Sequence, residues 1–460
     1  MNEDHLFVLI HGLWGNPTHM NQLRATVKKQ YPDAQILVPS GFSGTLTYDG
    51  VVICGNRVIK ETRQKIKEVQ ESKSITVTKF SIVGYSFGGL MARYIVGELD
   101  RTGFFDTIKP KNFTTFATPH LGTSTGRKDL LRRLFTQYGR YMLSQSGRDM
   151  FHKDGAGGIL ALLADPESVY YRVLSEKFER ISLYANAAND RTVPFFTAFI
   201  TTRDPFTDVH NCKPQYLEDA SPVIVDLSKP MSYVAGKPTR APWSRRQYIL
   251  FISLITIGPI VITLTLLGFM VTTQISEARI RKLSKQAGRA IELSSNKSTA
   301  TLIPSDQDSS IDLSKTEHHE TEASIMQSAV ENFMDATGSP DDTPSAPEAP
   351  TFSITTSPPL HRAPSTTSLT TICTALHEHR VSHPEFAKRS FCDDLPEPES
   401  MLELEPIQLE IEASLNRLPW HKYAVHVQST PMAHAAMINR RRIFEEGKVV
   451  LQHWVERLVD

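Results

Sequence analysis

Residues 80–92 read FSIVGYSFGGLMA, in which an apolar, β-branched run breaks into glycines around Ser86 and then into a helix-forming stretch. A strand, a glycine-flanked serine and a helix in this order are typical of the nucleophile elbow, G-x-S-x-G. Because the turn brings its backbone close to the neighbouring strand and helix, only residues without a β-carbon fit at Gly84 and Gly88. The turn raises the Ser86 hydroxyl above the sheet, beside the N–H groups that begin the helix. The pattern predicts acyl transfer through a serine ester, and a glycine-rich turn of some other α/β protein is the alternative.

The acid that such a serine requires has one good candidate. A serine nucleophile needs a base to take its proton and a carboxylate to orient that base. In folds with this elbow the acid follows the serine along the chain, and the histidine comes last. Residues 180–194 read RISLYANAANDRTVP, a buried strand and then a polar turn that contains Asp190. This position favours Asp190 as the catalytic acid over the commoner role of a turn aspartate as a local backbone cap.

Two histidines compete for the role of the base. His434 follows a short alternating strand, KYAVHV at 422–427, and precedes a helix-forming stretch that closes the chain. A loop at a strand end can carry His434 to the edge of the sheet where Ser86 and Asp190 lie, so we favour His434. His210 is the main rival, although no convincing strand precedes it.

The oxyanion hole has a candidate near the start of the sequence. An apolar strand at 5–10 runs directly into His11-Gly12-Leu13. In enzymes with this elbow, the second oxyanion donor comes from the loop after an early strand, and the first from the residue after the serine. We therefore expect the backbone N–H groups of Leu13 and Phe87 to bind the oxyanion. His11 and Gly12 are expected to shape the loop, with His11 acting through hydrogen bonds rather than proton transfer.

Four stretches of the chain resemble one known family. They are LIHGLWGNP at 9–17, GYSFGGL at 84–90, FATPHLGT at 116–123 and AHAAMI at 433–438. Together they resemble the eukaryotic serine esterase/lipase family of the α/β-hydrolase fold, and they are similar to fungal lipid-droplet phospholipases. The resemblance covers roughly the first 230 residues and the last fifty or so.

The resemblance implies lipid acyl esters as substrates and assigns the catalytic triad to Ser86, Asp190 and His434. The chain departs from the family pattern at Asn439, where an apolar residue is expected. It departs again in a very long insertion before His434, which makes the assignment of the histidine less direct than that of the serine.

The composition divides the chain into several parts. Residues 1–230 alternate strand-like and helix-like segments, which predicts an α/β-hydrolase core with a mostly parallel sheet. Residues 123–179 mix apolar and basic residues without an obvious strand and are expected to form a helical cap. Residues 293–400 are rich in Ser, Thr, Pro and acidic residues, which predicts a disordered linker. Residues 402–460 are expected to complete the hydrolase core with a C-terminal strand and helix.

Residues 248–273, YILFISLITIGPIVITLTLLGFMVTT, carry no charge and are long enough to span a bilayer once as a helix. Gly258-Pro259 near the middle can instead turn the chain back, which would give a hairpin in one leaflet. If the segment spans, His434 lies across the membrane from Ser86 and His210 must act as the base. A hairpin keeps both flanks on one side and allows His434. The sequence therefore predicts a membrane-embedded segment and leaves the two geometries open.

Charge and cysteine content exclude several function classes. Lys and Arg together number 50, as do Asp and Glu, which argues against nucleic-acid binding by charge. The four cysteines, at 54, 212, 373 and 392, lack metal-ligand spacing, so neither a metal site nor a disulfide framework is expected. No basic and apolar leader precedes the first strand, so we expect the catalytic domain to face the cytosol. The uncharged segment and the family resemblance favour a lipid droplet, the endoplasmic reticulum or both as its location. The sequence says nothing about oligomeric state.

These features favour a membrane-associated serine hydrolase, a lipase or phospholipase that needs no cofactor. Its partners would be a lipid substrate and a membrane or lipid-droplet monolayer. Two alternatives remain: an acyltransferase that uses the same serine, and a non-catalytic scaffold that keeps the fold at a lipid surface.

Overall fold

The computed structural model describes residues 4–123, 143–151, 158–190, 192–206, 212–229, 231–233, 267–285, 402, 404–430, 432–441 and 443–460. Parts of four predicted features lie outside these ranges. They are residues 124–142 and 152–157 of the expected cap at 123–179, residues 248–266 of the uncharged segment, the linker at 293–400, and His210.

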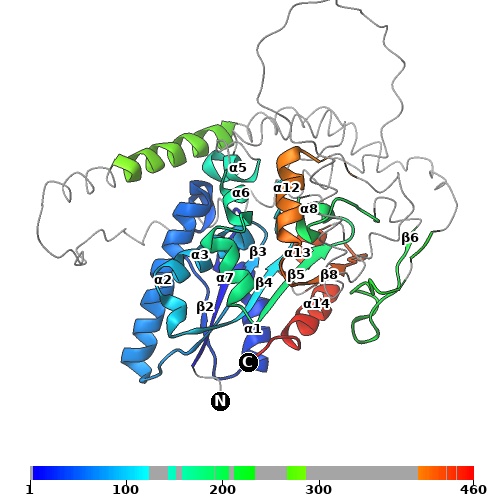
Figure 1. The fold of residues 1–460 in the computed structure, drawn as a ribbon, viewed down its shortest axis with the longest axis horizontal. Coiled ribbons are helices and arrows are strands. Elements are labelled where there is room, and N and C mark those ends of the chain that lie inside the picture. Colours follow the sequence, from blue (N-terminus) through cyan, green and yellow to red (C-terminus); the bar gives the residue numbers. More distant parts are fainter. Residues whose placement is uncertain are drawn as a thin grey trace, which may run out of the picture.

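A six-stranded sheet with the order β2-β1-β3-β4-β5-β8 forms the centre of the molecule (Figure 1). Every neighbouring pair in it is parallel, so the carboxyl ends of all its strands meet at one edge. The prediction of a mostly parallel sheet is therefore confirmed. The strands are β1 (His5–Ile10), β2 (Gln35–Leu37), β3 (Lys79–Tyr85), β4 (Lys109–Phe116), β5 (Arg180–Asn186) and β8 (Trp420–Val425), with a separate antiparallel pair of β6 (Cys212–Lys213) and β7 (Ser232–Tyr233).

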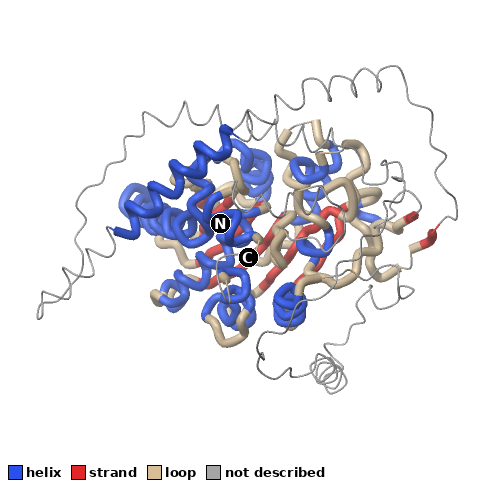
Figure 2. Tube along the Cα trace, turned by 90° about the horizontal axis from the view of Figure 1, so that it is seen from above, coloured by secondary structure: helices blue, strands red, loops and turns tan. Residues whose placement is uncertain are grey.

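Helices cover both faces of the sheet, which Figure 2 shows from above. One face carries α1 and α14, and the other carries α2, α3 and α7. The helices are α1 (Asn21–Gln30), α2 (Gly50–Lys73), α3 (Phe87–Arg101), α5 (Ser144–Met150), α6 (Ile159–Ala164), α7 (Val169–Glu176), α8 (Phe195–Phe199), α12 (Pro406–Leu415), α13 (Ala433–Ala436), α14 (Glu445–Val455) and an unlabelled helix at 267–285. Short 3₁₀ turns are η1 (Pro17–Met20), η2 (Gly44–Asp49), η3 (Phe104–Asp106) and η4 (Glu218–Ala220).

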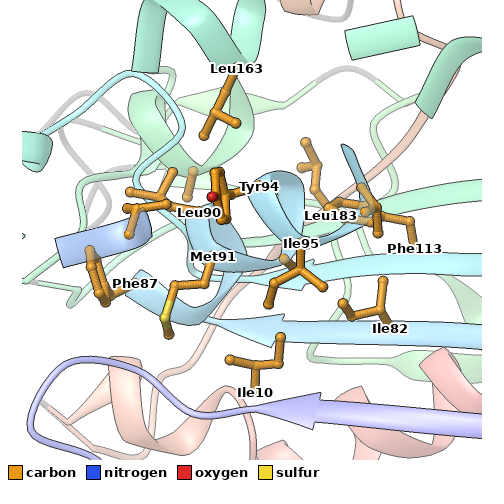
Figure 3. Close-up of a cluster of buried hydrophobic side chains, with 14 of the residues drawn as sticks. Ile10, Ile82, Phe87, Leu90, Met91, Tyr94, Ile95, Phe113, Leu163 and Leu183 are labelled. Carbon is orange, nitrogen blue, oxygen red and sulfur yellow. The ribbon is translucent and has the colours of Figure 1, made fainter. Parts of the chain in front are cut away.

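The alternation of apolar side chains along the strands fills two cores. In β1, Leu6, Val8 and Ile10 enter the core on the side of α3, while Phe7 and Leu9 enter the core on the side of α1 and α14. Figure 3 shows the first core, in which α3 lies between the strands and α6. This packing fixes the helix that begins directly after Ser86.

The C-terminal part of the chain completes the same sheet. Strand β8 pairs in parallel with β5, from Ile181 opposite Trp420 to Asn186 opposite Val425. The stretch before it is helix α12, and a capping box between Glu405 and Gln408 satisfies its first turn. Residues on both sides of the 248–273 segment therefore belong to one folded unit.

The described part of the expected cap is helical. Its last helix, α7, packs against α3: Tyr170 lies against Gly97, and its hydroxyl donates to Glu98 Oε1 at 2.6 Å. Helix α7 thus belongs to the layer over the sheet rather than to a cover over the strand ends.

Within the described residues, none of the helices has both the length and the apolar character needed to cross a bilayer. Of the uncharged segment at 248–273, only 267–273 is described, as the first two turns of the helix at 267–285.

Candidate active site

Ser86 lies on a strained turn between β3 and α3. Its backbone has φ 56° and ψ −127°, a conformation that residues other than glycine rarely adopt. A β-carbon at Gly84 would lie 2.6 Å from the Gly88 carbonyl oxygen, and one at Gly88 would lie 2.5 Å from the carbonyl oxygens of Ile10 and His11. The close backbone approach that the sequence indicated is present at both glycines.

The structure brings Ser86, His434 and Asp190 into one hydrogen-bonded line. His434 Nε2 is 3.0 Å from Ser86 Oγ, and His434 Nδ1 is 2.8 Å from Asp190 Oδ2. Because the carboxylate can only accept, Nδ1 carries a proton and Nε2 is left as the acceptor for the serine hydroxyl. The three residues follow the carboxyl ends of β3, β5 and β8, which lie at the same edge of the sheet.

The Asp190 carboxylate is buried and fully hydrogen-bonded, with 1 % of its side chain exposed. Oδ1 accepts from the backbone N–H groups of Thr192 and Val193, at 3.0 and 2.8 Å. Oδ2 accepts from His434 and from Asn186 Nδ2 at 2.7 Å. The backbone cap that was the alternative role for this aspartate is therefore present as well. Oδ1 caps the turn, and Oδ2 accepts from His434.

The loop that carries His434 is fixed by long-range contacts. The Tyr85 hydroxyl donates to the His434 carbonyl oxygen at 3.0 Å, and the two rings lie 5.0 Å apart. Earlier in the loop, the Glu446 carboxylate accepts from the backbone N–H groups of Gln428 and Ser429, at 2.9 and 3.1 Å. Both ends of the loop are thus tied to elements that are themselves packed on the sheet.

The expected oxyanion loop lies beside the serine. A β-carbon on Gly12 would be 2.8 Å from Ser86 Cβ and 3.3 Å from Ser86 Oγ, so the loop after β1 passes directly over the hydroxyl. Phe87 is the first residue of α3, and its N–H therefore has no partner within the helix. The Leu13 N–H follows Gly12 on the same loop. One expected donor thus directly follows Ser86 in the chain, and the other directly follows Gly12, whose backbone lies close to Ser86.

His11 is buried and lies away from the hydrogen-bonded line. Its Nδ1 donates to the Gly12 carbonyl oxygen at 3.0 Å, and its ring stacks on Phe42 at 4.1 Å. Burial lowers the pKa of His11 from 6.5 to about 4, so the ring is neutral near pH 7. These contacts favour a role in shaping the loop.

Sequence reasoning missed two residues that hold the site, Tyr85 and Asn186. Tyr85 stands at the variable position of the elbow, and Asn186 ends β5 four residues before Asp190. Neither position belongs to a motif, and only their contacts with His434 and Asp190 reveal them.

The departure at Asn439 has a structural reason. Its backbone is left-handed, with φ 51°, a conformation that asparagine adopts more readily than an apolar residue. With the side-chain amide oriented so that Nδ2 faces acceptors, it donates to the carbonyl oxygens of Arg441 and Phe444, at 2.8 and 3.2 Å. Asn439 therefore ends the turn after His434 without disturbing the site.

No cluster of His, Cys, Asp or Glu among the described residues has the arrangement of a metal site. Cys54 and Cys212 are buried, and the other two cysteines lie outside the described ranges. Burial raises the pKa of the Cys54 thiol, which makes it a poor nucleophile. His210, the rival base, also lies outside the described residues.

Residues 1–204 match the family model described as "Putative serine esterase (DUF676)". Among curated proteins, the chain is 29 % identical over 238 residues to "Putative lipase ROG1" of Saccharomyces cerevisiae, a match that covers 50 % of this chain and 33 % of the relative. It is 30 % identical over 206 residues to "Putative lipase C4A8.10" of Schizosaccharomyces pombe, covering 42 % of this chain and 26 % of the relative. The matched part thus spans a third or less of these relatives' own length.

Two solved structures are among those that the chain matches. One is phospholipase PlaB from Legionella pneumophila in complex with thio-NAD, with a TM-score of 0.28, 11 % identity and coverage of 65 % of this chain and 66 % of the other. The second is a lipase-esterase related protein from Clostridium acetobutylicum, with a TM-score of 0.24, 13 % identity and coverage of 42 % and 78 %. By its parallel sheet and its elbow the chain has the α/β-hydrolase fold, and its residues 1–204 are similar to the serine esterase family DUF676.

Proposed function

We propose that this chain is a serine hydrolase that cleaves the acyl esters of lipids, with Ser86, His434 and Asp190 as its catalytic triad. The observation that carries the proposal is the continuous line from Ser86 Oγ through the His434 ring to Asp190, with distances of 3.0 and 2.8 Å. This is the relation between nucleophile, base and orienting acid that ester hydrolysis requires.

In the acylation step, Ser86 Oγ attacks the ester carbonyl carbon while His434 Nε2 takes the hydroxyl proton. Asp190 stabilises the resulting imidazolium and keeps its orientation. The N–H groups of Leu13 and Phe87 bind the oxyanion, and the positive end of α3 points at the same place. When the intermediate collapses, the alcohol leaves with the proton from His434, and the acyl group stays on Ser86.

In the deacylation step, His434 takes a proton from water, and the hydroxide oxygen attacks the acyl-Ser86 carbonyl carbon. The same N–H groups bind the second oxyanion. Collapse returns the proton to Ser86 Oγ and releases the fatty acid, so the triad is restored without any other group.

Two observations support a lipid as the ester. The two curated relatives named above are both called putative lipases, and the chain contains the uncharged segment at 248–273. A segment of this kind keeps the active site at a lipid surface, where long-chain esters are concentrated. We therefore propose phospholipids or neutral lipids as the substrate class.

Labelling with a fluorophosphonate, which reacts covalently with activated serines, tests the proposed triad. The wild-type chain should be labelled, and both Ser86→Ala and His434→Ala should lose the label while they keep the wild-type unfolding temperature. An unreactive wild-type chain would contradict the enzyme and favour the scaffold. Labelling that persists in His434→Ala would instead contradict the assignment of the base.

We further propose that the uncharged segment enters the membrane as a hairpin from the cytosolic side through its residues 248–266, while residues 267–273 begin the helix that packs on the catalytic domain. The parallel pairing of β5 with β8 supports this geometry, because residues before and after the segment form one sheet and must lie on one side of the membrane. Protease protection of tags at the N-terminus and after residue 300 tests it. Both tags should be digested in intact microsomes or droplets, whereas protection of one tag alone would indicate a single span.

A further inference from the structure

The helix at 267–285 has two faces of different character. Its inner face is buried on the catalytic domain through Phe269, Thr273 and Ser276. Its outer face carries an apolar stripe in which each side chain is 53–63 % exposed; the stripe consists of Leu267, Met270, Val271 and Ile275. The spacing of three and four residues places the stripe on one side of the helix.

A buried carboxylate anchors this helix. Asp49 is fully buried and accepts from Arg279 Nη2 at 2.6 Å and Nε at 2.9 Å, and from Ser276 Oγ at 2.8 Å. Arg57 Nη2 donates to Oδ2 of the same carboxylate at 2.6 Å. A paired and hydrogen-bonded carboxylate at this depth fixes the orientation of the helix, because breaking the pair would leave a buried charge uncompensated.

The same anchor borders the loop of the proposed oxyanion hole. The Trp14 backbone N–H donates to Thr47 Oγ1 at 3.0 Å, and its indole N–H donates to the Tyr48 hydroxyl at 2.8 Å, both just before Asp49. The Phe269 ring lies 6.0 Å from the Trp14 ring. Trp14 directly follows Leu13, so the helix at 267–285 is packed on the loop that crosses Ser86.

The placement of the helix in the molecule agrees with these contacts. Figure 1 shows the helix at 267–285, in light green, at the end of the molecule toward which the sheet strands run from the N-terminus. Ser86 and His434 follow the carboxyl ends of β3 and β8 at this end. The exposed apolar stripe and the site therefore share one end of the protein.

The sequence around the stripe indicates what covers it. The residues immediately before Leu267 are the uncharged run at 248–266, and Arg281, Lys282 and Lys285 follow the stripe as exposed cations. An apolar helix face with cations beside it suits a phospholipid surface, where the side chains enter the acyl region and the cations meet head-group phosphates. Four side chains of one helix are few for a stable protein interface, which takes ~800 Å² from each partner.

We propose that the outer face of the helix at 267–285 docks on a phospholipid surface, and that Asp49 holds this helix so that the oxyanion loop and Ser86 face the lipid. The part of this inference that concerns lipid-ester turnover rests on the proposed function. The docking itself does not depend on catalysis, and a measurement independent of activity tests it.

That measurement uses the full chain with Cys373 and Cys392 replaced by Ser, reconstituted in phosphatidylcholine vesicles. A nitrobenzoxadiazole fluorophore is attached through Val271→Cys on the stripe or, as the matched control, through Val52→Cys on α2. Nitroxide-labelled lipid should quench the probe at 271 at least threefold more than the probe at 52. Equal quenching at the two positions would overturn the docking face, whether or not the protein hydrolyses esters. Protection of the 271 probe that appears only with dimerisation would also overturn it.

The role of the anchor is tested with Arg279→Gln and its matched control Arg57→Gln, since both arginines bind Asp49. Arg279→Gln should lower the hydrolysis of a vesicle-borne phospholipid about tenfold while hydrolysis of soluble p-nitrophenyl butyrate stays within twofold of the wild type. Arg57→Gln should leave the ratio of the two rates unchanged. An unchanged ratio in both variants would overturn the anchoring role, and a wild type inactive on both esters would overturn the proposed function instead.

Discussion

The elbow at 84–89 and the loop around His434 supply the two sides of one hydrogen bond, and they are held by different means. The elbow is held by local sterics, because its glycines lie against the backbone of β1 and α3 with no room for a β-carbon. The histidine loop is held by contacts across the fold, from Tyr85 to His434 and from Glu446 to residues 428 and 429. Substitutions that enlarge a glycine should therefore disrupt the elbow. Substitutions that delete a hydrogen bond should instead disrupt the histidine loop.

The largest expected effect comes from breaking the hydrogen bond between the two regions. Ser86→Ala and His434→Ala should each lower kcat by about 10⁴-fold or more, and the double variant should be no worse than either single one, because the two residues act as a unit. Steady-state hydrolysis of a short-chain ester measures this. Additive losses in the double variant would contradict a shared role.

Adding one methyl group to the elbow comes next. Gly88→Ala would place a β-carbon 2.5 Å from the carbonyl oxygens of Ile10 and His11, and overpacking of backbone costs roughly 1–3 kcal/mol or more. The unfolding temperature and the fluorophosphonate labelling should both fall.

Gly268→Ala is the matched control for the elbow, since nothing lies within 4 Å of a β-carbon at that position of the helix at 267–285. It should be neutral or stabilise by up to about 1 kcal/mol. Equal losses of stability in the two variants would mean that the elbow has no special steric limit.

Removing one contact from the histidine loop should have a smaller effect. Tyr85→Phe deletes the hydrogen bond to the His434 carbonyl oxygen, which should cost about 1 kcal/mol and lower kcat by about three- to tenfold with little change in KM. Tyr94→Phe, which loses a 3.2 Å bond to Asn56 on α2, is the control and should leave kcat unchanged. The rate at saturating substrate distinguishes the two.

The last prediction concerns the pH dependence of stability and tests whether the two regions unfold together. Burial lowers the pKa of His11, beside the elbow, and of His453, in α14, from 6.5 to about 4. The unfolded chain binds these protons near pH 6.5 and the folded chain does so only near pH 4. The stability is therefore fully present above about pH 6.5 and falls by about 1.4 kcal/mol per pH unit for each histidine as the pH drops toward 4.

Urea unfolding at pH 7, 6 and 5 measures this loss. In a single cooperative unit, His453→Asn should reduce the pH dependence of the same transition that reports on the elbow. Two separate transitions, only one of which responds to His453→Asn, would show that the C-terminal part unfolds on its own.

Much of the fold and of the site could be predicted from the sequence because both depend on local patterns. Apolar runs in the sequence predict the strands at 5–10, 79–85 and 180–186. The elbow and the His-Gly loop lie where two of those runs end. The support from Tyr85 and Asn186 could not be predicted, because it consists of contacts between elements that only the packing of the sheet brings together. The same holds for the bond between Arg279 and Asp49, which joins residues 230 positions apart.

The sequence by itself determined the turn that carries Ser86, because Gly84 and Gly88 and the strand and helix beside them specify a turn with no room for a β-carbon. It also determined that an uncharged segment interrupts the chain. Only the tertiary structure decided which histidine faces that serine. The reason is that β8 joins the sheet beside β5, and this pairing is a hydrogen-bonded contact between distant segments that no local pattern encodes.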